Sequence, residues 1–335
     1  MKNKFRIKKP FYKQAFPMTI FILLIVYAVS FLTPFIWAIF TSLTTGELFE
    51  MYQRVLEGVD TPWDIFCKAF SIPVAEYQVK YIHKPTGEIK VLTTLEGFTF
   101  TNYEWALLNI QVDTPLTGGV AKIDTLFVNS FIYTIVATAI TTTTHSVTAY
   151  IAARYSHHKI ASILYPIVIV TMLLPIVGAL PSELKMMQDL GIYDRVWGIW
   201  LMKGGFLGTN FLIFYASFKS ISWEYAEAAF VDGASHFRVL VQIMMPLAAG
   251  TLGALALMTF ITFWNDWKVN VQYVPNTWPM ISYALFRFNG DGSIKGLTVP
   301  NQMAGCIMIA TPLILLFIAF RKKLMGSITI GGIKG

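Results

Sequence analysis

Charged side chains are scarce in this sequence. Only 13% of its 335 residues are Asp, Glu, Lys or Arg, whereas 55% are hydrophobic. A soluble domain normally carries about twice that share of charge, so the composition excludes an ordinary soluble globular protein. Cysteine is scarce as well. Cys67 and Cys306 lie in different segments, so neither a disulfide framework nor a metal cluster is expected.

Several chemical signatures are missing too. The sequence has no G-x-x-x-x-G-K-[ST] phosphate loop, so any ATP that powers the protein must be bound by another polypeptide. His157-His158 has no acidic neighbours, which disfavours a membrane enzyme. The long apolar segments of the sequence carry no acidic residue near their middle, which disfavours a proton-driven transporter. We therefore predict no catalytic residues, no metal site and no cofactor bound by this chain. Nucleic acid is not an expected partner, because no soluble basic domain with stacking aromatics is present.

Long apolar runs are what the sequence does have. Each of six runs approaches the roughly 20 residues that cross a lipid bilayer as a helix. The predicted fold is an all-α polytopic membrane protein with six transmembrane helices. The first run follows a basic N-terminus but is long and lacks a cleavage site, so it is interpreted as a retained span. The six runs are Phe16–Thr41, Leu126–Tyr150, Ile160–Leu180, Val196–Phe218, Leu247–Trp264 and Asn301–Phe320.

The distribution of Lys and Arg predicts the orientation. Six spans from a basic N-terminus place both ends in the cytoplasm, and the cytoplasmic segments then hold fourteen basic residues against three acidic ones. That bias follows the positive-inside rule. The predicted organisation is a cytoplasmic N-terminus at 1–15, a first span at 16–41, an extracytoplasmic insert at 42–125, a core of five spans at 126–320 and a cytoplasmic tail at 321–335.

The insert at 42–125 has some strand character. Apolar and polar residues alternate over Tyr77–Leu92 on both sides of Lys84-Pro-Thr-Gly87, which predicts two short antiparallel strands. A helix is expected at Thr101–Asn109. The insert either caps the membrane domain or docks an external partner, and the sequence leaves both interpretations open.

The segment from Ser222 to Pro246 lies between the fourth and fifth spans. Ser222 and Ser235 are placed to cap two short helices, and Gly233 permits the chain to turn between them. Pro246 is expected in the first turn of the fifth span, where a missing N–H costs little.

The spacing in this segment resembles the Glu-Ala-Ala loop of ABC importer permeases. The motif Glu227-Ala228-Ala229, then Gly233, Ile243 and Pro246, follows the family pattern, and Met245 stands where that pattern has Leu. The resemblance implies a coupling loop, residues 222–246, that docks into an ATP-hydrolysing subunit. The residues assigned to coupling are Glu227, Ala228, Ala229, Asp232, Gly233, Ala234, Ile243 and Pro246.

Other stretches resemble the carbohydrate-uptake branch, in the half similar to the second maltose-type permease subunit. They are Ala149–Tyr155, Trp264–Trp267 and the glycine-rich tail Gly326–Gly335. The resemblance implies the type I ABC importer fold and a multi-pass protein of a bacterial cell membrane. It also implies a second permease subunit forming a heterodimer, two ATP-binding subunits that hold ATP and Mg, and an extracytoplasmic sugar-binding protein. An ABC permease for peptides or amino acids is the alternative.

Three residues are candidates for the substrate path. Trp264 and Asn265 offer an aromatic face beside a hydrogen-bonding group, as a sugar requires, although a Trp at a span end also suits the interfacial belt. Lys203 is ionisable at membrane depth, although it lies close enough to the outer surface to snorkel.

Overall fold

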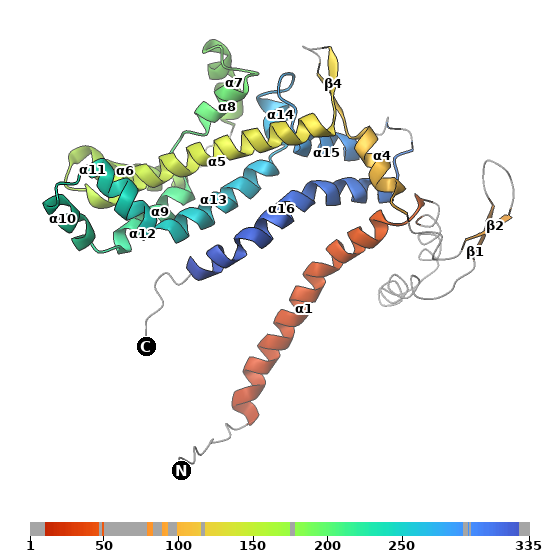
Figure 1. The fold of residues 1–335 in the computed structure, drawn as a ribbon, viewed down its shortest axis with the longest axis horizontal. Helices are drawn as coiled ribbons and strands as arrows, with labels where there is room; N and C mark the ends of the chain where they lie inside the picture. The colour runs from red at the N-terminus through yellow and green to blue at the C-terminus, as the bar shows by residue number, and fades with distance from the viewer. Residues whose placement is uncertain are drawn as a thin grey trace. The chain divides into compact units, whose positions relative to one another are not determined.

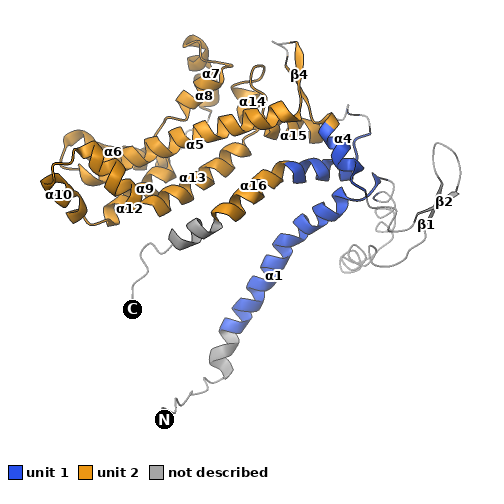
Figure 2. Cartoon of the chain, viewed as in Figure 1, with its two compact units in different colours: residues 1–107, 294–308 blue, residues 108–293, 309–335 orange. Residues whose placement is uncertain are grey.

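The computed structural model describes residues 11–46, 49, 79–82, 89–92, 99–114, 118–174, 178–290, 294 and 296–327. The basic residues before position 11, most of the insert and the tail 328–335 lie outside the described residues. The chain divides into two compact units (Figure 2), one made of residues 1–107 with 294–308 and the other of residues 108–293 with 309–335.

The first unit contains the long helix α1 (Phe11–Ser42) and the helix α4 (Thr101–Asn109), whose bounds confirm the predicted helix. The amide of Asn102 donates to the carbonyl oxygens of Ser42 and Thr44, at 2.9 and 2.7 Å. Most of α1 between Pro17 and Phe40 is exposed and apolar. Hydrogen bonds join the C-terminal end of α1 to α4, and lipid is the natural environment for its exposed apolar surface.

The predicted strand pair of the insert is confirmed. Strands β1 (Val79–Ile82) and β2 (Ile89–Leu92) are antiparallel, with Val79 opposite Leu92 and Ile82 opposite Ile89. The expected turn at 84–87 lies outside the described residues. A second pair follows α4 and joins β3 (Val112–Thr114) to β4 (Gly119–Ala121).

The second unit is a helical bundle organised around α5 (Ile123–Arg154), which packs along α9 (Thr209–Ser220) and α13 (Ala249–Trp264) (Figure 1). Small residues such as Ala137, Ser146 and Ala149 are buried along α5 and let the neighbouring backbones approach closely. The other helices of this unit are α6 (Lys159–Leu173), α7 (Leu180–Asp189), α8 (Val196–Met202), α10 (Glu224–Val231), α11 (His236–Val239), α12 (Met245–Leu247), α14 (Lys268–Gln272) and α15 (Ile281–Gly290). The last helix, α16 (Val299–Ser327), belongs to the first unit as far as Met308 and to the second unit from Ile309.

Three of the described helices are by themselves long and apolar enough to cross a membrane. They are α1 from Pro17 onward, α5, and α16 as far as Phe320. A fourth span is possible if the helical segments His236–Leu247 and Ala249–Trp264 are counted together, although they meet at 79°. The chain is therefore a multi-pass membrane protein, and the other expected spans are built from shorter helices.

The third and fourth spans differ from the continuous helices that hydropathy predicts. α6 ends at Leu173, and Leu174 has an extended backbone with ψ 122°, because a residue before proline avoids the helical region. The fourth span, expected over Val196–Phe218, is broken between α8 and α9. Three glycines fall in that break, and Gly208 has a φ of +140°, which suits glycine.

The entry to the fifth span also differs from the prediction. Pro246 lies in α12, at the end of the helical segment that begins at His236, and the span helix α13 starts only at Ala249. Just before Pro246 the helix widens into a π-helical turn, Leu240–Met244. Proline lacks an N–H and crowds the carbonyl four residues earlier, so a regular α-helical turn is unfavourable there.

Candidate functional site

The loop between α9 and α13 begins with the short helix α10 (Glu224–Val231). The N–H of Glu224 donates to Ser222 Oγ at 3.3 Å, but the N-cap residue of the helix is Trp223, so Ser222 does not occupy the capping position that the sequence predicted for it. At the other end the N–H of Ala234 reaches Ala229 O at 2.9 Å and the N–H of Gly233 reaches Phe230 O at 3.0 Å. This pair of bonds is the Schellman motif, which needs a left-handed residue. Gly233 supplies it with a φ of +79°.

The two faces of α10 have different environments. Ala226 and Ala229 are buried in the core of this chain, among side chains of α5 and α9. Glu227 and Ala228 are exposed, and Val231 is 88% exposed. Of the three alanines in this helix, only Ala228 is available to a partner. The motif therefore combines an inward packing residue with an outward polar one.

The second half of the loop packs on the same core. Ser235 caps α11 as predicted, because its Oγ accepts the N–H of Arg238 at 3.3 Å. Ile243 is half-buried and packs against the core, whereas Asp232 and Pro246 are exposed. Ala234 is half-buried beside the turn. The assigned coupling residues thus fall into two groups: Glu227 and Asp232 are exposed acids, whereas Ala229 and Ile243 pack against the core of this chain.

Two residues at the end of α5 hold the loop in place. Arg154 Nη2 donates to the carbonyl oxygens of Phe218 and Ile221, and its guanidinium lies 5.3 Å from the centre of the Trp223 ring. The Tyr155 hydroxyl is 2.7 Å from His236 Nδ1. The sequence marked Arg154 and Tyr155 only as part of a family-like stretch. Their side chains span 64 or more positions along the chain, so spacing alone gave no signal of these contacts.

Polar contacts also connect α9 with α13. Ser217 Oγ donates to Thr251 Oγ1 at 3.1 Å near the loop, and Asn210 Nδ2 donates to Thr259 Oγ1 at 3.2 Å farther away. Both bonds lie between antiparallel helices whose ends the loop joins. In apolar surroundings such bonds have few competitors, so they favour movement of α9 and α13 as a pair.

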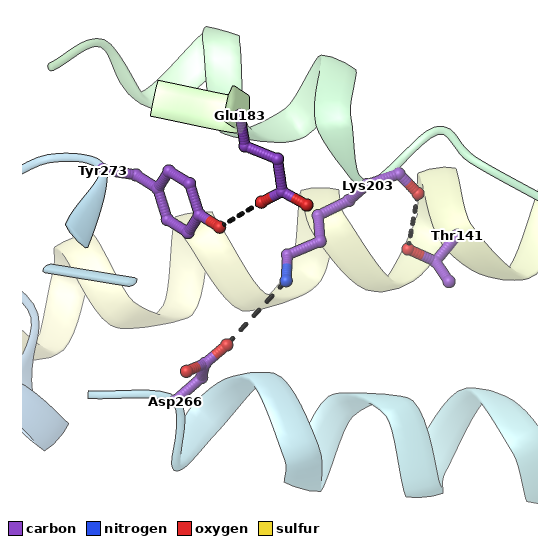
Figure 3. Close-up of polar contacts among 5 residues, drawn as sticks. All are labelled: Thr141, Glu183, Lys203, Asp266 and Tyr273. Carbon is purple, nitrogen blue, oxygen red and sulfur yellow. Dashed lines mark hydrogen bonds and ion pairs between the residues drawn. The ribbon is translucent and has the colours of Figure 1, made fainter. Parts of the chain in front are cut away.

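Lys203 lies just after α8, at the end of the α9 and α13 pair that is away from the loop. Its Nζ lies 3.8 Å from Asp266 Oδ2 and 4.8 Å from the centre of the Phe263 ring. The Lys203 and Asp266 side chains are only 27% and 25% exposed. Thr141 Oγ1 on α5 donates to the Lys203 carbonyl at 3.0 Å. Figure 3 shows these groups converging from α5, the end of α8 and the end of α13.

Glu183 and Tyr273 lie beside this ion pair (Figure 3). The Tyr273 hydroxyl donates to Glu183 Oε2 at 2.7 Å. Burial, followed by the hydrogen bond and the negative charge of Glu183, raises the pKa of Tyr273 to about 12, because each effect disfavours the phenolate. We call Glu183, Lys203, Asp266 and Tyr273 the lysine cluster. In this cluster Lys203 forms an ion pair, whereas the sequence suggested a substrate-path residue or a snorkelling lysine.

Trp264 and Asn265, the other substrate-path candidates, have different positions. Trp264 is 1% exposed, its ring centre is 4.7 Å from that of Phe131, and its Nε1 donates to Ile309 O at 3.3 Å. It is a core residue of this unit, which agrees with neither an interfacial belt nor an open sugar-facing ring. Asn265 is exposed at the end of α13.

Long apolar helices that pack into a bundle, with a helical loop seated on α5 and α9, define a multi-pass membrane component. The chain belongs to the family of binding-protein-dependent transport system inner membrane components, whose model matches residues 145–324, more than half of the chain. The match includes the loop, Lys203 and Asp266.

Individual relatives are more distant. The diacetylchitobiose uptake system permease protein NgcG of Streptomyces coelicolor is 24% identical over 257 residues, covering 74% of this chain and 79% of the relative. The trehalose transport system permease protein SugB of Mycobacterium tuberculosis is 25% identical over 255 residues, covering 75% and 88%. A crystal structure of a bacterial ABC transporter for the acidic polysaccharide alginate has a similar fold, with a TM-score of 0.64 and 20% identity over 94% of this chain and 98% of that one.

Proposed function

We propose that this chain is a permease subunit of an ATP-driven importer of oligosaccharides. The observation that carries the proposal is the loop 222–246, whose inner face packs on α5 and α9 while its outer face presents Glu227, Ala228 and Asp232. A loop held so firmly can transmit force from a docked subunit into the bundle. The names of NgcG and SugB, which are sugar permeases, favour oligosaccharides over peptides or amino acids.

The coupling residues have distinct roles in this proposal. Glu227 and Asp232 meet basic groups of an ATP-hydrolysing subunit, and their charges set its orientation. Ala228 allows close approach, while Ala229, Ala234 and Ile243 keep the loop seated on its own chain. Gly233 makes the turn, and Pro246 closes the helical segment before α13.

The transporter requires other polypeptides. A second permease forms a heterodimer with this chain, which takes the place of the second maltose-type subunit. A pair of ATP-binding subunits, which hold ATP and Mg, docks at the cytoplasmic loop 222–246. An extracytoplasmic protein delivers the sugar. The basic N-terminus and tail lie in the cytoplasm, as the distribution of Lys and Arg favours.

The mechanical path runs along α9 and α13. When the ATP-binding subunits close, the loop is displaced together with the ends of α9 and α13 that it joins. The bonds Ser217–Thr251 and Asn210–Thr259 pass that displacement along the pair to the lysine cluster at the far end. Access on the two sides of the membrane thereby alternates with the ATP cycle.

Reconstitution tests the proposal. Proteoliposomes with the second permease, the ATP-binding subunits and the binding protein should accumulate an oligosaccharide from a labelled panel only when ATP is inside. Glu227→Ala should reduce both retention of the ATP-binding subunits and uptake, whereas Leu190→Ala, which removes a 62% exposed side chain just after α7 and outside the loop, should not. ATP-dependent uptake of peptides but of no saccharide in the panel would refute the sugar assignment.

A further inference from the structure

A cavity of about 400 Å³ opens at the end of α13. Its walls come from the segment after α13, from α15 and from one residue of α16, and all of them belong to the second unit. We call it the Trp267 pocket. It is lined by Asn265, Trp267, Ser282, Leu285, Phe286, Asn289, Gly290 and Ile309.

Aromatic rings form one wall of this pocket. Trp267 and Phe286 stack with their ring centres 3.9 Å apart and their planes 7° from parallel. Phe286 is 44% exposed although it is fully apolar. The stack holds both rings rigidly, so a flat apolar ligand face can pack on them with little loss of side-chain freedom.

Hydrogen-bonding groups lie beside the rings. The Ser282 hydroxyl is buried and has no hydrogen-bond partner among the described residues. Asn265 Nδ2 donates to Ile261 O at 2.8 Å, which orients the amide and leaves its side-chain oxygen as an acceptor at the pocket. Because this Oγ is itself buried, a ligand can bond to it only when the Ser282 side chain turns toward the pocket; the new bond would then satisfy a hydroxyl that is otherwise costly to leave without a partner.

Among the described residues, none that lines the pocket has a charged side chain. A pyranose ring is apolar on its faces and polar at its edges, which matches an aromatic wall with a hydroxyl and amides beside it. A lipid tail would match the rings but would leave Ser282 without a partner. A uronate carboxylate would find no cation among the described lining residues, and Lys268, whose Nζ lies 5.9 Å from the centre of the Trp267 ring, is outside the lining, so the charge would lack a close partner.

We propose that the Trp267 pocket is a subsite for one neutral pyranose unit of the transported saccharide. The inference rests on the proposed function and assigns the sugar contact to Trp267 and Phe286 with Asn265 and Ser282, whereas Trp264 is a packing residue behind it. Asn265 precedes Asp266 of the lysine cluster directly, so a sugar in this subsite lies next to the far end of the α9 and α13 pair. The chain then contacts its cargo itself.

The test uses the complete transporter in nanodiscs with its binding protein. A panel of neutral trisaccharides (maltotriose, cellotriose, chitotriose) is screened for stimulation of ATP hydrolysis, and the strongest stimulator is kept as the probe. Phe286→Ala should raise the half-saturating concentration of that probe about tenfold, which corresponds to about 1.4 kcal/mol. Ser282→Ala, a smaller change that keeps the rings, should raise it severalfold. The affinity of the isolated binding protein for the probe is measured as a reference.

The controls separate the subsite from the general function. Phe286→Tyr keeps an aromatic ring and should retain near-normal half-saturation, as should Trp197→Ala, which removes a 49% exposed aromatic side chain of α8 outside the pocket. Stimulation by a probe with unchanged half-saturation in both Phe286→Ala and Ser282→Ala would overturn the subsite and leave the importer proposal intact. If no saccharide stimulates hydrolysis or is taken up, the importer proposal fails and the subsite fails with it.

Discussion

Gly233 offers a sharp test of how the coupling loop is built. Its φ of +79° lies in the left-handed region, and a Cβ added there would meet nothing within 4 Å. The cost of Gly233→Ala is therefore conformational and not steric, about 1–2 kcal/mol for a non-glycine residue in that region. The alanine also restricts the unfolded chain, which offsets about 0.4–1 kcal/mol. Gly233→Ala is therefore expected to lower the stability of the turn by about 1 kcal/mol.

A matched glycine in the same unit makes the comparison clean. Gly253 lies inside α13, and a Cβ there also meets nothing within 4 Å in this chain, but its φ is not positive. Gly253→Ala should therefore be neutral or stabilising by as much as about 1 kcal/mol, because alanine favours a helix interior. The two Gly→Ala substitutions should therefore differ by about 1–2 kcal/mol in their effect on local stability, because one destabilises the turn and the other is neutral or stabilises α13.

The assay is hydrogen exchange of the α10 amides in the purified transporter. A loss of about 1 kcal/mol should speed exchange at the loop by about fivefold in Gly233→Ala. Gly233→Asn should fall between wild type and alanine, because asparagine tolerates the left-handed region better. Retention of the ATP-binding subunits should follow the same order. Equal exchange at the loop in Gly233→Ala and Gly253→Ala would refute the reasoning.

Three further predictions concern the residues that hold the bundle. Lys203→Met leaves Asp266 partly buried without its cation and should lower the stability of the protein by about 1–2 kcal/mol, between the values for exposed and buried ion pairs. The midpoint of thermal unfolding should recover in the double variant that also carries Asp266→Asn. An unchanged midpoint in the single variant would contradict the ion pair. Arg154→Lys should reduce uptake per ATP hydrolysed, because lysine lacks the planar donors that reach two carbonyls, and Arg154→Met should reduce it further. Since the raised pKa of Tyr273 keeps its phenol neutral to about pH 12, any stability it contributes is present below its usual pKa of about 10 and disappears as the pH rises through about 12. Tyr273→Phe should therefore leave the phenolate absorbance change up to about pH 11 almost unaltered, and a loss of one tyrosine's share would show a normal pKa.

Features with local causes could be predicted from the sequence. The helix Thr101–Asn109, the strand pair in Tyr77–Leu92, the cap at Ser235 and the turn at Gly233 all depend on residues within a few positions of one another. Periodicity and capping chemistry describe such short-range preferences well. The family-like spacing of the loop belongs to the same group, although its role in coupling remains a prediction.

Features with tertiary causes could not be predicted. Hydropathy treats Val196–Phe218 as one span because it averages over the glycines that break it. The pairing of Lys203 with Asp266, 63 positions apart, depends on α13 lying against the break. The sequence around Trp264 is the same whether its ring faces lipid, sugar or protein, and its burial, its bond to Ile309 O and its contact with Phe131 distinguish these environments only in the folded chain.

The bend at Ala248 determines how the loop can act on the bundle. The helical segments on its two sides meet at 79°, so a displacement along the first segment pushes across the start of α13 and not along its axis. α13 itself is tied to α9 at Thr251 and Thr259 and to the end of α8 at Asp266. These three contacts, which are spread along α13, resist local bending of the helix more than they resist rotation of α9 and α13 together. Motion that enters at the loop is therefore expected to tilt α9 and α13 together, and the largest displacement should occur at the lysine cluster and the adjacent Trp267 pocket, farthest from the loop.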